Sequence, residues 1–156
     1  MIDFAVIEFA YPKNNPENPY SVGLIVIWDG FVIQEFHSFI KLSDPSDKNI
    51  PESIKKRCEF APSFGLIERT IGELVLNLPL VTHDGAIARK VFENEHSHLG
   101  FPIPYGVANI IETYPMTGAS LKDSCDLYGI PLINQSDSLD NAKACARLFL
   151  KLKEEE

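Results

Sequence analysis

The sequence opens with FAVIEFA, residues 4–10, a short apolar run with one charged side chain, Glu8, near its middle. A continuous apolar run of this length predicts a strand that is buried on both faces, as in the centre of a parallel or mixed sheet. Because side chains alternate across a strand, Val6, Glu8 and Ala10 share one face. Burying a carboxylate costs free energy unless it is paired or binds a cation. Glu8 is therefore either a structural residue, ion-paired or exposed at a sheet edge, or part of a functional site.

The segments that follow predict a meander of three antiparallel strands. Residues 11–19 contain three prolines and three asparagines, which is typical of a loop. Residues 20–28 are rich in Val, Ile and aromatic side chains and predict a second strand. Asp29-Gly30 is a two-residue hairpin signal, after which residues 31–40 return as the third strand.

The rest of the chain alternates between helical and strand patterns. Helices are expected over residues 52–57, 64–76, 85–95, 121–128 and 138–153, and strands over 78–82 and 109–114. Ser120 is expected to cap the fourth of these helices and Gly129 to end it. His96 and His98 fall in an expected loop over residues 96–106, where we interpret them as solvated side chains rather than metal ligands.

The last of these helices carries an apolar stripe. Its members recur at helical spacing, and we expect Ala142, Cys145, Ala146 and Phe149 to face the sheet. Together the patterns predict one α/β domain over residues 1–153, in which later strands join an antiparallel meander by crossover connections. Residues 154–156 are expected to form a frayed acidic tail.

Composition narrows the classes of function. The 156 residues carry a net charge of −8, which argues against a broad basic surface for nucleic acid. The three cysteines, Cys58, Cys125 and Cys145, are an odd number without metal-ligand spacing, so we interpret them as reduced thiols. No secretory signal opens the sequence and no apolar run is long enough to cross a membrane. We therefore expect a cytoplasmic protein that does not bind membranes.

Six stretches carry a resemblance to a known family. They are residues 4–10, 21–26 with 29–30, 61–64, 80–85, 121–130 and 142–146. In this order they resemble the DEDDh group of 3′–5′ exonucleases, which includes the proofreading subunit of bacterial replicative DNA polymerases. No single stretch is diagnostic, and the ordered set carries the resemblance. It implies an α/β fold of the ribonuclease H-like type, in which a three-stranded antiparallel meander plus parallel strands form a mixed sheet flanked by helices.

The resemblance also implies a chemistry. In the family, four carboxylates hold two divalent metal ions about 4 Å apart, one on each side of the scissile phosphate. Such ions are Mg²⁺ or Mn²⁺, which prefer oxygen ligands. A histidine serves as the general base for the attacking water.

This sequence departs from the family pattern at each of those five positions. The first motif, Asp-x-Glu, reads Glu8-Phe9-Ala10, and the second acid position is Ala88. In the third motif, anchored on residues 142–144, Asn141 takes the place of the acid and Ser136 that of the histidine. An alternative register places Asp140 at the acid position and Gln135 at the histidine position, and glutamine cannot act as the base either.

Glu8 is thus the one acid retained, lengthened by a methylene. One carboxylate cannot hold two Mg²⁺ ions, because each ion usually takes one or two carboxylates of its own. The resemblance therefore predicts a degenerate exonuclease-fold domain without catalytic activity, a pseudoenzyme that serves as a binding or scaffolding module and needs no cofactor. The acidic balance favours another protein as the partner, self-association included, with weak or no binding of nucleic acid.

Two alternatives remain open from the sequence. Glu8, Asp84, Asp137 and Asp140 are candidates for a rearranged site that binds Mg²⁺ or Mn²⁺ and supports 3′–5′ exonuclease activity on single-stranded nucleic acid. Asp84 and Asp137 also fit helix caps, and Asp140 fits a first helical turn. The second alternative is binding of single strands without cleavage, through stacking on aromatic side chains. The candidates are Phe9, Tyr11, Tyr20, Tyr105 and Tyr114, for which core and loop packing is the favoured interpretation. In either case Glu8 is expected to lie near a cleft without a distant basic partner.

Overall fold

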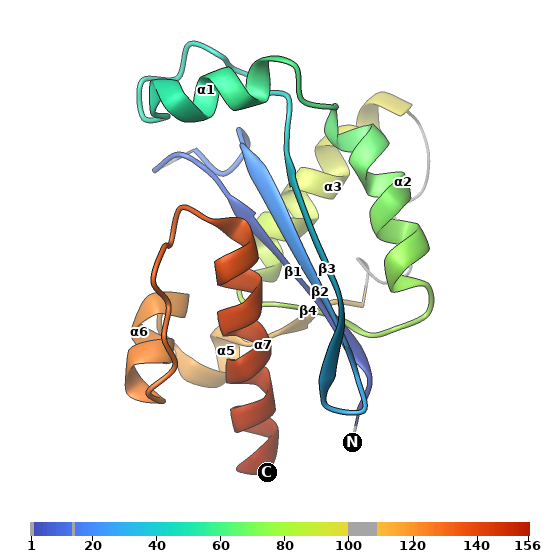
Figure 1. Cartoon of the computed structure of the whole chain (residues 1–156), viewed down its shortest axis with the longest axis vertical. Helices are drawn as coiled ribbons and strands as arrows, with labels where there is room; N and C mark the ends of the chain where they lie inside the picture. Colours follow the sequence, from blue (N-terminus) through green and yellow to red (C-terminus); the bar gives the residue numbers. More distant parts are fainter. Residues whose placement is uncertain (1, 14, 100–108) are drawn as a thin grey trace.

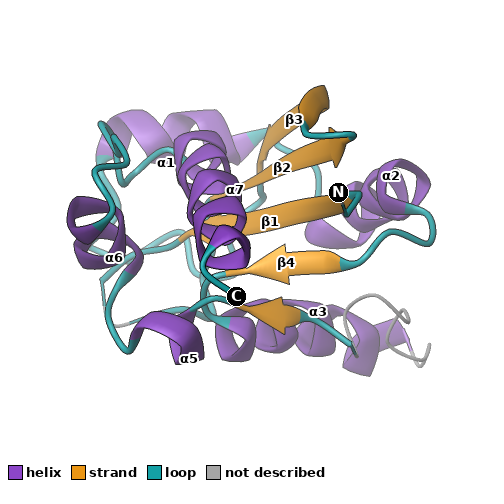
Figure 2. Ribbon diagram, turned by 90° about the horizontal axis from the view of Figure 1, so that it is seen from below, coloured by secondary structure: helices purple, strands orange, loops and turns teal. Residues whose placement is uncertain are grey.

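A computed structural model of the chain describes residues 2–13, 15–99 and 109–156. In this part of the chain a five-stranded sheet has helices on both faces (Figures 1 and 2). The strand order is β3-β2-β1-β4-β5, so the FAVIEFA strand lies in the centre of the sheet. The predicted α/β class, with a mixed sheet flanked by helices, is confirmed.

The strands are β1 (Phe4–Ala10), β2 (Ser21–Trp28), β3 (Phe31–Phe39), β4 (Leu80–Thr82) and β5 (Ile111–Glu112). β2 pairs antiparallel with both β1 and β3. β4 pairs parallel with β1, and β5 pairs parallel with β4. Asp29 and Gly30 have φ angles of 52° and 80°, as a hairpin turn with two left-handed residues requires. The predicted meander is therefore confirmed.

The helices are α1 (Glu52–Glu59), α2 (Phe64–Val75), α3 (Gly85–Leu99), α5 (Tyr114–Thr117), α6 (Leu121–Leu127) and α7 (Ser138–Glu154). The hydroxyl of Ser120 accepts a hydrogen bond from the Asp123 N–H, and Gly129 has a φ of 68°, so both predicted ends of α6 are confirmed. No helix in the described residues is both long and apolar enough to cross a membrane.

The sequence interpretation was wrong in two places. Residues 96–99 extend α3, so His96 and His98 belong to a helix and not to a loop. No helix-breaking residue occurs in that helix before Gly100, which explains the extension. The strand expected over residues 109–114 is limited to Ile111–Glu112, and α5 follows with Pro115 in its first turn. Further along, α7 includes Glu154, and Glu156 pairs with Lys153 at 3.2 Å.

Two apolar layers hold the sheet and helices together. One lies between the sheet and helices α2 and α3. The other lies between β1, β2 and α7, where Ala142, Cys145, Ala146 and Phe149 contact Phe4 and other strand residues. The predicted apolar stripe of α7 is confirmed. All three cysteines are buried and free.

The contact between β2 and the start of α7 gives a first prediction. A Cβ at Gly23 would lie 2.4 Å from the carbonyl oxygen of Ser138 and 2.6 Å from the nitrogen of Leu139. Both are backbone atoms, so a methyl group here would push the helix away from the sheet. We expect Gly23→Ala to lower the free energy of unfolding by about 2 kcal/mol, measured by urea denaturation.

Gly72 provides the matched control. It is exposed in α2, and a Cβ there would meet nothing within 4 Å. Gly72→Ala should therefore stabilise the chain by about 1 kcal/mol through helix propensity. If Gly23→Ala were also neutral or stabilising, β2 and α7 would not approach each other as closely as the structure places them.

Candidate functional site

A pocket of about 480 Å³ opens where β1 and β4 end, between α3 and the start of α7. Because these two strands are parallel, their carboxyl ends meet at the same edge of the sheet, where open α/β folds bind ligands. Glu8, Ala10, Ala88 and Asn141 all line this pocket, which we call the Glu8 pocket. The fold thus brings together four positions that the resemblance singled out.

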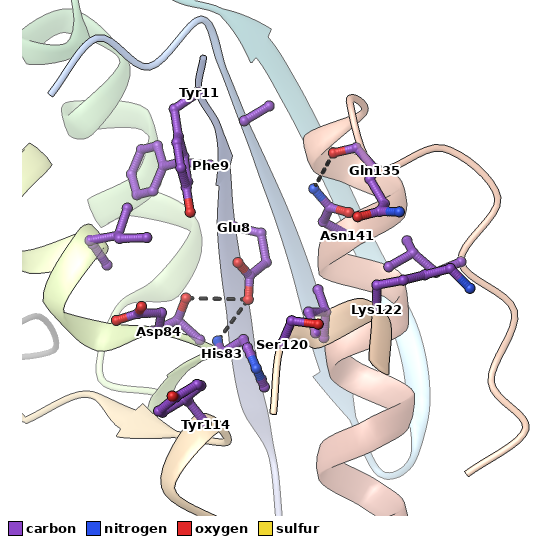
Figure 3. Close-up of a pocket in the computed structure, with 16 residues that line it drawn as sticks. Glu8, Phe9, Tyr11, His83, Asp84, Tyr114, Ser120, Lys122, Gln135 and Asn141 are labelled. Carbon is purple, nitrogen blue, oxygen red and sulfur yellow. Dashed lines mark hydrogen bonds between the residues drawn. The ribbon is translucent and has the colours of Figure 1, made fainter. Parts of the chain in front are cut away.

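Glu8 lies at the centre of the pocket, with Asp84 on one side and Asn141 on the other (Figure 3). Its Oε1 atom accepts a hydrogen bond of 2.7 Å from the backbone N–H of His83 and lies 3.3 Å from the hydroxyl of Thr82. In residues 2–13, 15–99 and 109–156 no lysine or arginine forms an ion pair with Glu8. The expected position of Glu8, near a cleft and without a distant basic partner, is confirmed.

The surrounding protein changes the acidity of Glu8. Burial raises the pKa of this carboxyl from 4.5 to about 7, although hydrogen bonds from the His83 backbone, Cys145 and Thr82 lower it, and nearby Asp84 raises it further. Near neutral pH the carboxyl is therefore about half protonated.

The other three family positions in the pocket carry no acid. Ala10 and Ala88 are buried and present only methyl groups. The side-chain amide of Asn141 donates a hydrogen bond of 2.9 Å to the carbonyl oxygen of Gln135. Neither alanine offers a ligand atom, and Asn141 contributes a neutral group in place of a negative one.

For the third motif, each of the two alignment registers considered contributes one residue to the pocket. Asn141 comes from one register and Gln135 from the other, and both line the pocket. Ser136 and Asp140 are not among the residues that line it. The backbone N–H of Ser136 instead donates a hydrogen bond of 3.0 Å to Oδ1 of Asn134.

The four acids proposed for a rearranged metal site do not gather in the pocket. Asp84 lines it, and its Oδ1 atom accepts a hydrogen bond from the Ala86 N–H at 3.1 Å. Asp137 caps α7 and accepts from the N–H groups of Leu139 and Asp140. Across the described residues no group of three or more His, Cys, Asp and Glu side chains could hold a metal ion.

His83 lines the pocket, and two hydrogen bonds fix its side chain there, which its position in the sequence did not reveal. Its Nε2 atom lies 2.8 Å from the carbonyl oxygen of Ala119, and its Nδ1 atom lies 2.7 Å from the hydroxyl of Thr113. A carbonyl oxygen only accepts, so Nε2 carries the proton and Nδ1 accepts from Thr113. Burial lowers the pKa of His83, which favours the neutral ring. With both ring nitrogens engaged, the side chain of His83 is held in place beside the pocket while its backbone N–H donates to Glu8.

Aromatic side chains contribute less to the pocket than their number in the sequence suggests. Tyr11 and Tyr114 line it, and Tyr114 packs edge-on against His83 at 5.7 Å between ring centres. Phe9 also lines it but is buried against Phe64 and Phe92. Tyr20 is buried elsewhere, and Tyr105 lies outside the described residues. Lys122, which the sequence analysis missed, lines the pocket and pairs with Asp126.

Comparison with known proteins finds matches in structure alone. No protein-family model matches the sequence, and no curated protein matches it. A 3′-exonuclease solved for its 3′-end specific recognition of the histone mRNA stem-loop has a TM-score of 0.77 at 11% identity, covering 98% of this chain and 82% of that one. The nuclease domain of 3′hExo, a DEDDh family member bound to rAMP, has a TM-score of 0.71 at 11% identity, covering 98% and 92%. Exonuclease X in complex with 5′ overhanging duplex DNA has a TM-score of 0.70 at 12% identity, with the same coverages.

These matches confirm the resemblance at the level of fold. The chain has the ribonuclease H-like fold of DEDDh 3′–5′ exonucleases over almost its whole length. At 11–12% identity the likeness is one of architecture.

Proposed function

We propose that this chain, which has the fold of 3′–5′ exonucleases, is a binding module that holds a ligand in the Glu8 pocket without hydrolysing it. One observation carries the proposal: Ala10, Ala88 and Asn141 line the same pocket as Glu8. The pocket, of about 480 Å³, lies at the edge of the sheet, while three of its candidate acid positions are neutral. A cleft of that kind retains the means to bind but not to cleave.

The electrostatics of the pocket support this proposal. Two metal ions at a phosphodiester each need oxygen ligands and usually one or two carboxylates. Among the described residues that line the pocket, the carboxylates are Glu8 and Asp84, and both already accept hydrogen bonds from backbone N–H groups. The raised pKa of Glu8 further lowers the negative charge available near neutral pH.

The charge of the whole chain favours a protein partner. A net charge of −8 repels phosphate, and Lys122, which lines the pocket, is paired with Asp126. We therefore infer that the partner is another protein or a second copy of this chain, with little or no binding of nucleic acid. The three buried free thiols are compatible with a reducing compartment, and we expect the cytoplasm.

A nuclease assay tests the proposal against its alternative, a rearranged metal site built from Glu8, Asp84, Asp137 and Asp140. The purified chain is incubated with end-labelled single-stranded DNA or RNA and millimolar Mn²⁺, and Glu8→Ala serves as the matched variant. We expect no shortening with either protein. Shortening that needs Mn²⁺ and disappears in Glu8→Ala would overturn the proposal and establish the exonuclease.

A thermal-shift experiment gives a second prediction on the same site. A metal stabilises a protein only in proportion to its binding to the folded state. We expect the midpoint of unfolding to change by less than about 1 °C between excess chelator and millimolar Mg²⁺ or Mn²⁺. A shift of several degrees would reveal a metal site and favour the enzyme.

The control for this experiment restores the family pattern. It combines Glu8→Asp, Ala10→Glu, Ala88→Asp and Asn141→Asp with Gln135→His, since Gln135 and not Ser136 lines the pocket. Four carboxylates close together repel one another without metal, so this variant should be less stable than the natural chain in chelator. Mg²⁺ or Mn²⁺ should then recover part of the loss. If the variant does not respond to metal, these are not the positions that a metal site in this fold requires.

A further inference from the structure

One edge of the sheet has no partner among the described residues. β3 is the outermost strand, and within the described residues only β2 forms backbone hydrogen bonds with it. Residues 31–35 are exposed, and no helix lies alongside the outer edge of β3 in Figure 2. An edge of this kind leaves N–H and C=O groups free to pair with another strand.

β3 also lacks most of the features that normally protect an edge. Its sequence FVIQEFHSF contains no lysine and no proline, and Glu35 is its one carboxylate. A bulge leaves Ile33 without a partner in β2, so the regular register runs from Gln34 to Phe39. Beyond the bulge, Trp28, Phe31 and Val32 are each more than half exposed. Trp28 and Phe31 are cross-strand partners, so these two side chains together present exposed apolar surface at the hairpin end.

A row of cations borders this edge. Lys143 of α7 lies 3.5 Å from Glu35, which places that side of the helix next to β3. Arg147 and Lys151 follow at spacings of four and eight residues, so they lie on the same side, and both are exposed. Arg147 forms no ion pair in the described residues, and the pairs of Lys143 with Glu35 and of Lys151 with Glu154 are exposed and weak.

The spacing of these cations matches a strand. One helical turn of four residues advances about 6 Å, and two residues of a strand advance about 6.8 Å. Acidic side chains at alternate positions of an added strand could therefore each meet one of the three cations. A second copy of β3 cannot supply that pattern, because Glu35 is its one acid. The complementary occupant is a different and acidic segment.

We propose that the β3 edge binds an extended acidic segment of a partner protein as a sixth strand of the sheet. Alternate acidic side chains of the segment face Lys143, Arg147 and Lys151, and an apolar side chain contacts Trp28 and Phe31 at the hairpin end. Main-chain pairing supplies affinity in this mode of recognition, and the alternating side chains supply specificity. The inference rests on the proposed role as a binding module, but its surface includes no residue of the Glu8 pocket.

The test uses synthetic nine-residue peptides with a fluorescent label and the whole natural chain. One peptide alternates Glu with Val and Ile, and its control carries Lys in place of each Glu. We expect the acidic peptide to bind at least about tenfold more tightly, measured by fluorescence anisotropy at low salt. The double variant Lys143→Glu with Arg147→Glu should reverse that preference. Lys56→Glu changes an exposed cation on α1 and should leave it unchanged.

Backbone methylation separates strand addition from simple charge attraction. Methyl groups are placed on alternate amide nitrogens of the acidic peptide, in two complementary sets. One set should abolish binding and the other should not, because only alternate N–H groups of an added strand face β3. Equal effects of the two sets, no preference for the acidic peptide, or a dimer joined through β3 that binds neither peptide would each overturn the inference. Glu8→Gln should bind the peptide normally, so this result is independent of the nuclease assay.

Discussion

At pH 8 the Glu8→Gln variant should be more stable than the natural chain by about 3 kcal/mol, because burial raises the pKa of Glu8 from 4.5 to about 7. Between pH 4.5 and about 7, Glu8 holds a proton in the folded state that it has released in the unfolded state. The contribution of Glu8 to stability is therefore fully present below pH 4.5 and falls as the pH rises to about 7. Glutamine is neutral at every pH, and its carbonyl oxygen can still accept from the His83 N–H.

The measurement is urea denaturation of both proteins between pH 4 and pH 8. The difference in unfolding free energy should be near zero at pH 4 and reach its full value near pH 8. Burial lowers the pKa of His83, which makes stability rise with pH below its ordinary value, but this contribution is common to both proteins and cancels. Glu73→Gln, on the exposed face of α2, should change stability by less than about 0.5 kcal/mol at either pH. A difference for Glu8→Gln that does not depend on pH would show that Glu8 is well solvated.

Replacing Ala146 by aspartate should cost about 3 kcal/mol at neutral pH. Ala146 is 4% exposed and lies between α7 and the sheet, in an apolar cluster with Phe4 and Phe149. The described members of that cluster offer no partner for a carboxylate. A charge placed there must be buried without compensation or must displace the helix.

Two controls separate charge from size and from helix propensity. Ala146→Asn has nearly the same shape without the charge, so it should cost less than Ala146→Asp at pH 7, and the two should converge as the pH falls. Arg147→Asp introduces the same acid at the next, exposed position and should cost less than about 1 kcal/mol. If Ala146→Asp cost under about 0.5 kcal/mol, the range of ordinary surface changes, α7 would present a different face to the sheet.

The features that could be predicted from sequence were those with a local pattern. The apolar run of residues 4–10, the Asp29-Gly30 turn and the stripe of α7 each depend on neighbours within a few residues, and each is found in the structure. α5 could not be predicted, since a helix of four residues is too short to show a period. The extended end of α3 was hidden because histidines and later prolines resembled a loop.

The site was predictable in position but not in chemistry. Glu8, Ala10, Ala88 and Asn141 meet in one pocket, because the order of the elements determines where strand and helix ends converge. The role of His83 depends on a contact with Glu8 across 75 residues, and the raised pKa of Glu8 depends on burial. Long-range contacts of this kind leave no signal in a single sequence.

The burial of the three cysteines determines how fast their thiols react with an oxidant. Burial raises the pKa of every one of these thiols, of Cys125 to about 11 and of Cys145 well above its ordinary value. The thiolate is the form that attacks peroxides and disulfides, and here it is both scarce and shielded from solvent. Oxidants and alkylating reagents therefore reach Cys125 and Cys145 only when the chain opens, whereas Cys58 lines a surface pocket of about 320 Å³. The rate at which Cys125 and Cys145 are modified is therefore a measure of how often the folded chain opens.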